Sequence, residues 1–184
     1  MLHRTEAELT AGLDRVRRSP AEGGPVELIV RRPAPGEREV LAEATLDPDH
    51  GLIGDGWRVR ASSRTPDCAP DPDRQLTLMN ARVAGLVATD PSRWPLAGDQ
   101  LYVDLDLSLD NLPAGTRLAL GSAVIQVTDP PHRGCPKFSA RFGVDAFRFV
   151  NSPLGRALRL RGLNARVVVG GTVRVGDQVA RAAI

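Results

Sequence analysis

Turn-forming residues interrupt this sequence at short intervals and limit the length of any helix or strand that it can form. The chain of 184 residues contains 18 glycines and 15 prolines, well above average usage. Because glycine and proline mark turns and end helices, this pattern favours many short strands over a bundle of long helices. Aromatic residues make up only 4% of the chain, so we expect a core of Val, Leu, Ile and Ala.

The apolar pattern between the turns predicts mostly strands. We expect strands at residues 26–33, 38–46, 75–79, 96–112 and 116–129, the last divided by a turn at Gly121 and Ser122. Two more are expected within 164–179, joined as a hairpin at the Gly170–Gly171 pair. Helices are expected at 4–18, 80–89 and 142–152, and loops at 47–57 and 60–74. The prediction is a mainly β fold, a barrel or a sandwich, with a few short peripheral α-helices.

The N-terminal segment differs from the rest because it has a helical pattern. Thr5 and Glu8 have the spacing of a capping box. The apolar residues that would share one helix face are Leu9, Leu13 and Val16. We therefore expect residues 1–22 to form a helical extension and residues 23–184 to form one β-barrel domain. With no long apolar run and no signal-peptide core, the sequence predicts a cytoplasmic protein that does not contact a membrane.

The stretch PPHRGCPKFSARFG, residues 130–143, places one cysteine among several basic residues. From His132 to Arg166 the chain contains eight Lys and Arg but a single acid, Asp145. The rest of the chain carries more acidic than basic side chains. Such asymmetry favours an anionic ligand, although a solvated basic face would produce the same pattern.

Cys135 is the candidate catalytic residue and the candidate metal ligand of this stretch. A thiolate is both a nucleophile and a soft metal ligand, and nearby positive charge favours it over the thiol. Gly134 leaves room for a ligand, and Pro136 fixes the backbone that follows. The alternative is a buried, inert cysteine. Cys68 lies in a loop that lacks a basic cluster, and its pairing with Cys135 stays open.

The basic neighbours of Cys135 are the candidate cofactor-binding residues. These are His132, Arg133, Lys137, Arg141 and Arg161. Arginine offers a planar pair of donors to phosphate or carboxylate. His132 would tune Cys135 or donate to an anion, or it would be an ordinary surface histidine. For Arg148, Arg156 and Arg159 we favour solvated charge, and for Asp55 in GLIGDG (51–56) a turn-capping role.

The order of several motifs resembles the MOSC domain family, named for the C-terminal domain of molybdenum cofactor sulfurases. The pieces that carry the resemblance are GLIGDGW (51–57), GDQL (98–101), LPAGTRLALGSAVIQVTDPPHRGCPKF (112–138), RFGVDAFRFVNS (141–152) and RGLNARVVVGGTVRVGDQV (161–179). Together the resemblance covers roughly residues 26–180. It implies a MOSC-type β-barrel and a cysteine, here Cys135, that handles sulfur or binds the molybdenum of a pterin cofactor. The resemblance also implies that the chain belongs to a family associated with pyridoxal phosphate.

Three classes of function are compatible with these residues, and the resemblance favours the first. The first is binding of molybdenum cofactor (molybdopterin), or of a related anionic sulfur-bearing ligand, with sulfur transfer or molybdenum-dependent reduction at Cys135. Its partners would be an external reductase or a cysteine desulfurase. The second is a non-catalytic cofactor carrier, and the third is a metal-free, thiol-dependent detoxification protein. Nucleic acid is not an expected partner, because the chain lacks an RNA-binding motif and has few aromatic residues for base stacking.

Overall fold

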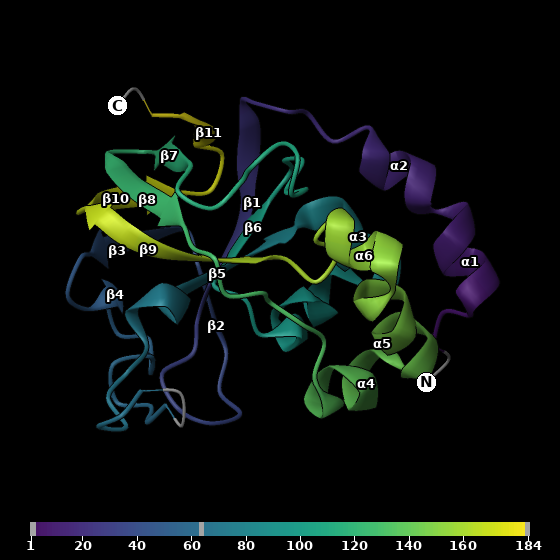
Figure 1. Ribbon diagram of the computed structural model, residues 1–184, viewed down its shortest axis with the longest axis horizontal. Coiled ribbons are helices and arrows are strands. Elements are labelled where there is room, and N and C mark those ends of the chain that lie inside the picture. Colours follow the sequence, from purple (N-terminus) through teal and green to yellow (C-terminus); the bar gives the residue numbers. More distant parts are fainter. Residues whose placement is uncertain (1–2, 63–64, 183–184) are drawn as a thin grey trace.

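Strand pairing closes the main sheet into a barrel. In the computed structural model, which describes residues 3–62 and 65–182, seven strands form a ring in the order β1-β11-β7-β8-β9-β5-β6. They are β1 (Gly24–Arg31), β5 (Leu76–Asn80), β6 (Leu101–Val103), β7 (Arg117–Leu120), β8 (Ala123–Val127), β9 (Leu163–Val169) and β11 (Gln178–Arg181). Only β5 and β6 run parallel; the other neighbours are antiparallel. The predicted mainly β barrel is confirmed (Figure 1).

Two predicted elements near the second, smaller sheet are wrong. The expected strand 38–46 is two strands, β2 (Glu39–Leu41) beside β1 and β3 (Glu43–Asp47) between β10 (Gly171–Arg174) and β4 (Gly51–Leu52). The Gly170–Gly171 pair joins β9 to β10, which belong to different sheets, so it is not a hairpin. A Cβ on Gly171 would lie 2.5 Å from the carbonyl carbon of Ser122. The glycine therefore permits a close backbone crossing rather than a tight turn.

The long strand predicted at 96–112 is also wrong, because only Leu101–Val103 forms β6. The residues before it end a 3-10 helix, η2 (Pro91–Ala97). Beyond it, the Asp106 carboxylate accepts a hydrogen bond from the backbone N–H of Ser108, at 2.9 Å, and turns the chain out of the sheet. Leu105 and Leu107 are nevertheless buried in the barrel core. The alternating pattern therefore reported burial correctly and strand length incorrectly.

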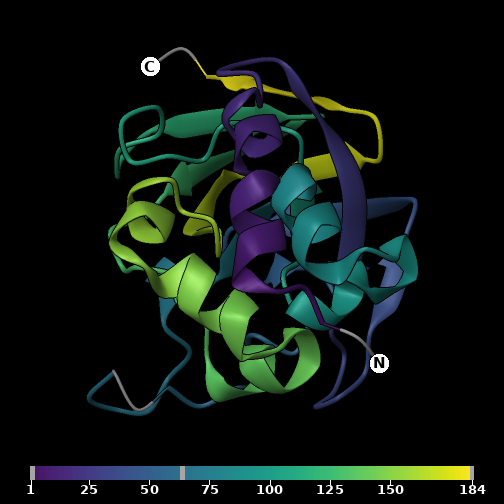
Figure 2. The same cartoon turned by 90° about the vertical axis from the view of Figure 1, so that its right-hand side faces the viewer.

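Short helices gather on one side of the barrel, the side that faces the viewer in Figure 2. They are α1 (Glu6–Ala11), α2 (Leu13–Arg17), α3 (Ala81–Ala88), α4 (Pro136–Phe142), α5 (Val144–Asn151) and α6 (Pro153–Ala157). A 3-10 turn, η1 (Pro72–Arg74), lies apart from them, before β5. The capping box of Thr5 and Glu8 is confirmed. The expected helix 4–18 divides at Gly12, where a Cβ would lie 2.3 Å from Leu86 Cδ1. Close packing on α3 explains that glycine.

Two apolar clusters hold these layers together. The first fills the barrel with aliphatic side chains of its strands, among them Ile29, Leu78 and Ile125. The second lies between the outer barrel surface and the helices, and includes Leu9 of α1 and Phe138 of α4. The chain passes from the first cluster to the second between β8 and α4. The residues that join these two elements carry Cys135.

Candidate functional site

The loop of residues 128–135, which we call the cysteine loop, joins β8 to α4 and presents an exposed thiol. Cys135 is the N-terminal cap residue of α4, and Pro136 occupies the first turn of that helix. The Cys135 side chain is exposed and forms no disulfide. The cysteine is therefore not the buried, inert thiol that was the alternative interpretation.

Two asparagines hold the backbone of the cysteine loop in place. Asn151 accepts a hydrogen bond from Gly134 N at 3.1 Å and donates one to Gly134 O at 3.2 Å. Asn164 donates to Pro130 O at 2.8 Å. A Cβ on Gly134 would lie 2.7 Å from Asn151 Nδ2 and 3.0 Å from Val150 Cγ2. Glycine is required here because the loop lies directly against α5.

The predicted basic residues separate into free and engaged side chains. Arg133 and Lys137 are exposed, and the described residues give neither side chain a hydrogen bond or ion pair. Arg141 donates from Nη1 to Leu96 O at 2.7 Å. Arg161 is buried with a 6% exposed side chain and forms an ion pair of 2.7 Å with Asp99. Within the described residues, Arg133 and Lys137 are therefore the members of the predicted basic set with no such partner, and each lies two residues from Cys135 in the sequence.

The Arg161–Asp99 pair is the buried support beneath the cysteine loop. Arg161 Nη2 also donates to Ala97 O at 2.8 Å, and its guanidinium lies 5.1 Å from the ring centre of Phe138 in α4. Asp99 is completely buried. Two further atoms of the pair, Asp99 Oδ1 and Arg161 Nε, are buried without a hydrogen-bond partner among the described residues. These atoms retain the capacity to bind a polar group.

His132 is held against this ion pair rather than at the surface. Its side chain is 13% exposed, and Nε2 lies 3.4 Å from Asp99 Oδ1 without forming a hydrogen bond of good geometry. Burial, reinforced by the charge of Arg161, lowers the pKa of His132 to about 3, while Asp99 and a hydrogen bond with Asn164 oppose the shift. The imidazole is therefore neutral at physiological pH.

The low pKa of His132 predicts a loss of stability in acid. The unfolded chain binds the proton near pH 6.5, whereas the folded chain binds it only near pH 3. Between these values the unfolded state holds more protons, so the free energy of unfolding should fall as pH decreases, by on the order of a few kcal/mol. Urea denaturation between pH 7 and pH 4.5 should show a shallower slope for His132→Gln. The exposed His3→Gln control should keep the wild-type slope; an equal change in both variants would contradict the assignment.

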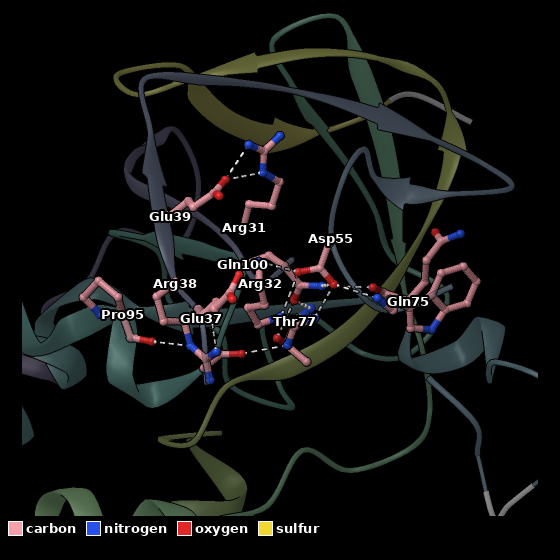
Figure 3. A network of polar contacts seen from close by, with 12 residues as sticks. Arg31, Arg32, Glu37, Arg38, Glu39, Asp55, Gln75, Thr77, Pro95 and Gln100 are labelled. Atoms are coloured by element: carbon pink, nitrogen blue, oxygen red, sulfur yellow. Dashed lines mark hydrogen bonds and ion pairs between the residues drawn. The ribbon is translucent and has the colours of Figure 1, made fainter. Parts of the chain in front are cut away.

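A second buried ion pair, which sequence reasoning missed, lies next to the first. Arg32 donates to Asp55 from Nε at 2.9 Å and from Nη2 at 2.9 Å (Figure 3). Its Nη1 donates to Gly98 O at 2.7 Å. Asp55 Oδ1 also accepts from Trp57 N at 3.0 Å, which confirms its turn-capping role. Gln100 accepts from Thr77 at 2.7 Å, and its amide nitrogen lies 3.5 Å from Asp55 Oδ1. The GDQL motif (98–101) therefore contributes Asp99 to the first pair, and Gly98 O and the Gln100 side chain to the second.

Positive charge around the site also comes from the N-terminal half of the chain. Burial lowers the pKa of Arg38, and the charges of Arg141, Arg32 and Arg60 lower it further. Arg38 and Arg141 are distant in sequence, and both donate to carbonyls of η2, those of Pro95 and Leu96. The sequence suggested a basic segment limited to 132–166. The structure instead brings arginines of two regions to one side of the barrel.

A cavity of about 220 Å³ lies next to the cysteine loop. Its walls come from residues 128–133 of the loop, from the α5–α6 region and from the start of β9. His132 and Arg133 line it, while Cys135 does not. Arg156 and Arg159, for which we expected solvated charge, also line it. Arginines of the cysteine loop and of the α5–α6 region therefore line the same cavity.

Comparison with known proteins is consistent with this fold. Residues 72–180 match the model of the MOSC domain family. The structure of YuaD protein from Bacillus subtilis has a TM-score of 0.58 at 18% identity, covering 88% of this chain and 97% of that one. YiiM from Escherichia coli has a TM-score of 0.55 at 20% identity, covering 87% and 70%. These likenesses show a shared fold.

Neither a curated relative nor a membrane-spanning helix was found for the residues compared. No curated protein sequence matches the chain. Within residues 3–62 and 65–182, no helix is long and apolar enough to cross a membrane.

Proposed function

Because the chain belongs to the MOSC domain family, as its motifs predicted, we propose that it binds molybdenum cofactor, or a related anionic sulfur-bearing ligand, at Cys135. We further propose that it uses this site for sulfur transfer or for molybdenum-dependent reduction. The observation that carries the proposal is the exposed Cys135 thiol, fixed by a constrained loop beside two uncommitted basic side chains.

The residues at the site fit such a ligand. In the described part of the chain, no group of three or more His, Cys, Asp or Glu is placed to hold a metal ion. A metal that arrives within its own organic ligand needs only one protein donor, and a thiolate is a suitable soft donor. The surrounding arginines would attract the ligand's anionic groups. Arg161 is also positively charged, and its buried Nε has no hydrogen-bond partner among the described residues.

The residues at the site would have different roles in this function. Cys135 would supply the sulfur ligand or nucleophile, and Arg133 and Lys137 would bind anionic groups. Arg141 and Arg161 would act mainly as positioning residues, because their donors are engaged by backbone carbonyls and Asp99. When bound, the cofactor would supply a metal centre for two-electron chemistry, with electrons from an external reductase.

The sulfur-transfer route needs only the cysteine and a partner persulfide. The Cys135 thiolate would attack the outer sulfur of a persulfide on a cysteine desulfurase, and the desulfurase thiolate would leave. A nucleophile on the acceptor would then attack the outer sulfur of Cys135–S–S⁻, and the Cys135 thiolate would leave again. Neither step requires a net oxidant or reductant.

A non-catalytic carrier is the second candidate. Cys135 is exposed and does not line the cavity, so a ligand held there would remain accessible to other proteins. A carrier would bind the cofactor without turnover of an N-hydroxylated test substrate in the presence of a reductase. Turnover under those conditions would instead support the reductive function.

Elemental and pterin analysis tests the proposal directly. Protein purified from a host that makes the cofactor should contain molybdenum and pterin in similar molar amounts, and the content should fall at least tenfold in Cys135→Ser. For the sulfur-transfer route, mass spectrometry after incubation with a desulfurase and cysteine should show one added sulfur on Cys135. If molybdenum, pterin and added sulfur were all lacking, the metal-free thiol function would replace this proposal.

A further inference from the structure

The cavity beside the cysteine loop does not include Cys135, although Arg133 lines it. Its volume of about 220 Å³ is below the range of roughly 300–1,000 Å³ that is usual for drug-sized ligands. It can therefore enclose a single ring or a short branched chain, but not a pterin cofactor. This volume favours a ligand that is smaller than a pterin cofactor.

Apolar side chains form much of the cavity wall. Val150 and Leu163 are buried at its inner side, and the rings of Pro130 and Pro131 belong to the cysteine loop. Such a lining favours an apolar body in the ligand, because water leaves apolar surfaces on both sides when the ligand binds.

Uncompensated positive charge lies at the same cavity. Arg133, Arg156 and Arg159 line it, together with one carboxylate, Asp129, whose charge acts on Arg159. Arg159 is also engaged by Leu112 O at 2.5 Å. The described residues give the side chains of Arg133 and Arg156 no hydrogen bond or ion pair. Two free guanidiniums that border an apolar cavity favour a carboxylate, since each can donate two parallel hydrogen bonds.

The cavity and Cys135 are connected through the cysteine loop. Arg133 lines the cavity and lies two residues before the cysteine. Gly134 lies against Val150, which lines the cavity from α5. A carboxylate bound by Arg133 would therefore lie at the part of the cavity wall that precedes Cys135 in the sequence.

We propose that this cavity binds the organic substrate of the Cys135 site, and that the substrate is a small carboxylic acid with an apolar or aromatic body. The part of this inference that concerns the substrate role rests on the proposed function. The binding of the acid itself does not, because Cys135 is not part of the cavity.

Calorimetric titration with benzoate, benzamide and inorganic sulfate tests the inference. Benzoate should bind, and benzamide, which has the same shape without the charge, should bind at least tenfold more weakly. Arg156→Gln should weaken benzoate binding about tenfold, the loss expected for one charge-assisted contact. Arg148→Gln is the matched control, because Arg148 is an exposed arginine of α5 that does not line the cavity. It should change the affinity by less than twofold.

The inference would be overturned by a lack of benzoate binding, by equal benzoate losses in Arg156→Gln and Arg148→Gln, by benzamide binding as tight as benzoate, or by sulfate binding tighter than benzoate. The last would indicate a bare anion site. Titration of Cys135→Ser separates this inference from the proposed function. Benzoate binding that persists in a protein without molybdenum, pterin or persulfide would refute the proposed function alone. Cofactor content without benzoate binding would refute only the inference.

Discussion

Cys135→Ser is expected to abolish cofactor binding and the associated activity while leaving the fold intact. Serine has nearly the same size as cysteine, and the side chain is exposed, so the free energy of unfolding should change by less than about 0.5 kcal/mol. A hydroxyl is neither a soft metal ligand nor able to carry a persulfide. Metal and pterin content, with thermal unfolding followed by circular dichroism, measures both effects.

Cys68→Ser is the matched control for this prediction. Cys68 is also exposed and free, but it lies in the loop between β4 and β5, outside the cysteine loop. The control should retain wild-type cofactor content and activity. Retained binding in Cys135→Ser would refute the assignment of Cys135. Equal losses in both variants would instead indicate a redox pair of the two cysteines.

Asp99→Ala is expected to lower the free energy of unfolding by about 3–5 kcal/mol, the usual effect of removing one partner of a buried ion pair. Asp99 is fully buried and lies 2.7 Å from Arg161 Nη1. Its loss leaves the Arg161 guanidinium buried without its counter-ion. Arg161 also lies over Phe138, so the start of α4 and the position of Cys135 should be disturbed together. Chemical denaturation at pH 7 measures the stability change.

Glu43→Ala provides the surface comparison. Glu43 pairs with Arg174 at 3.0 Å, but both side chains are about 60% exposed, so its removal should cost less than about 1 kcal/mol. A loss of the same size in Asp99→Ala would show that the buried pair is not the support of the cysteine loop.

Much of the barrel could be predicted, because its strands are marked locally. The turn at Gly121 and Ser122 separates β7 from β8 as expected, since glycine and serine are common turn residues. The Gly170–Gly171 pair has an equally strong local signal and a different outcome. Gly171 of this pair lies against the backbone of Ser122, which is far away in sequence. Local patterns therefore located the chain reversals but not the sheet to which each strand belongs.

The candidate site also has some features that the sequence predicted and others that it did not. The cysteine and its basic neighbours are visible in the sequence because they lie within one short stretch. Helix α4 was not predicted, because its seven residues carry too little pattern, and it begins at the proline that follows Cys135. Asp99 and Arg32 were not selected as site residues, because nothing local distinguishes a buried acid or arginine from an exposed one. A search for acids that follow glycine near barrel strands would have selected Asp99 and Asp55 together.

The sequence alone determined that the chain would form a turn-rich β-barrel, that Cys135 would be its reactive candidate, and that its family would be the MOSC domain family. These conclusions depend on residue types and order, which the sequence records completely. The tertiary structure alone decided that Arg161 is committed to Asp99, that His132 is buried and neutral, and that Arg133 and Arg156 border one cavity. Those facts depend on burial and on pairs of residues distant in sequence, and folding alone brings such pairs into contact.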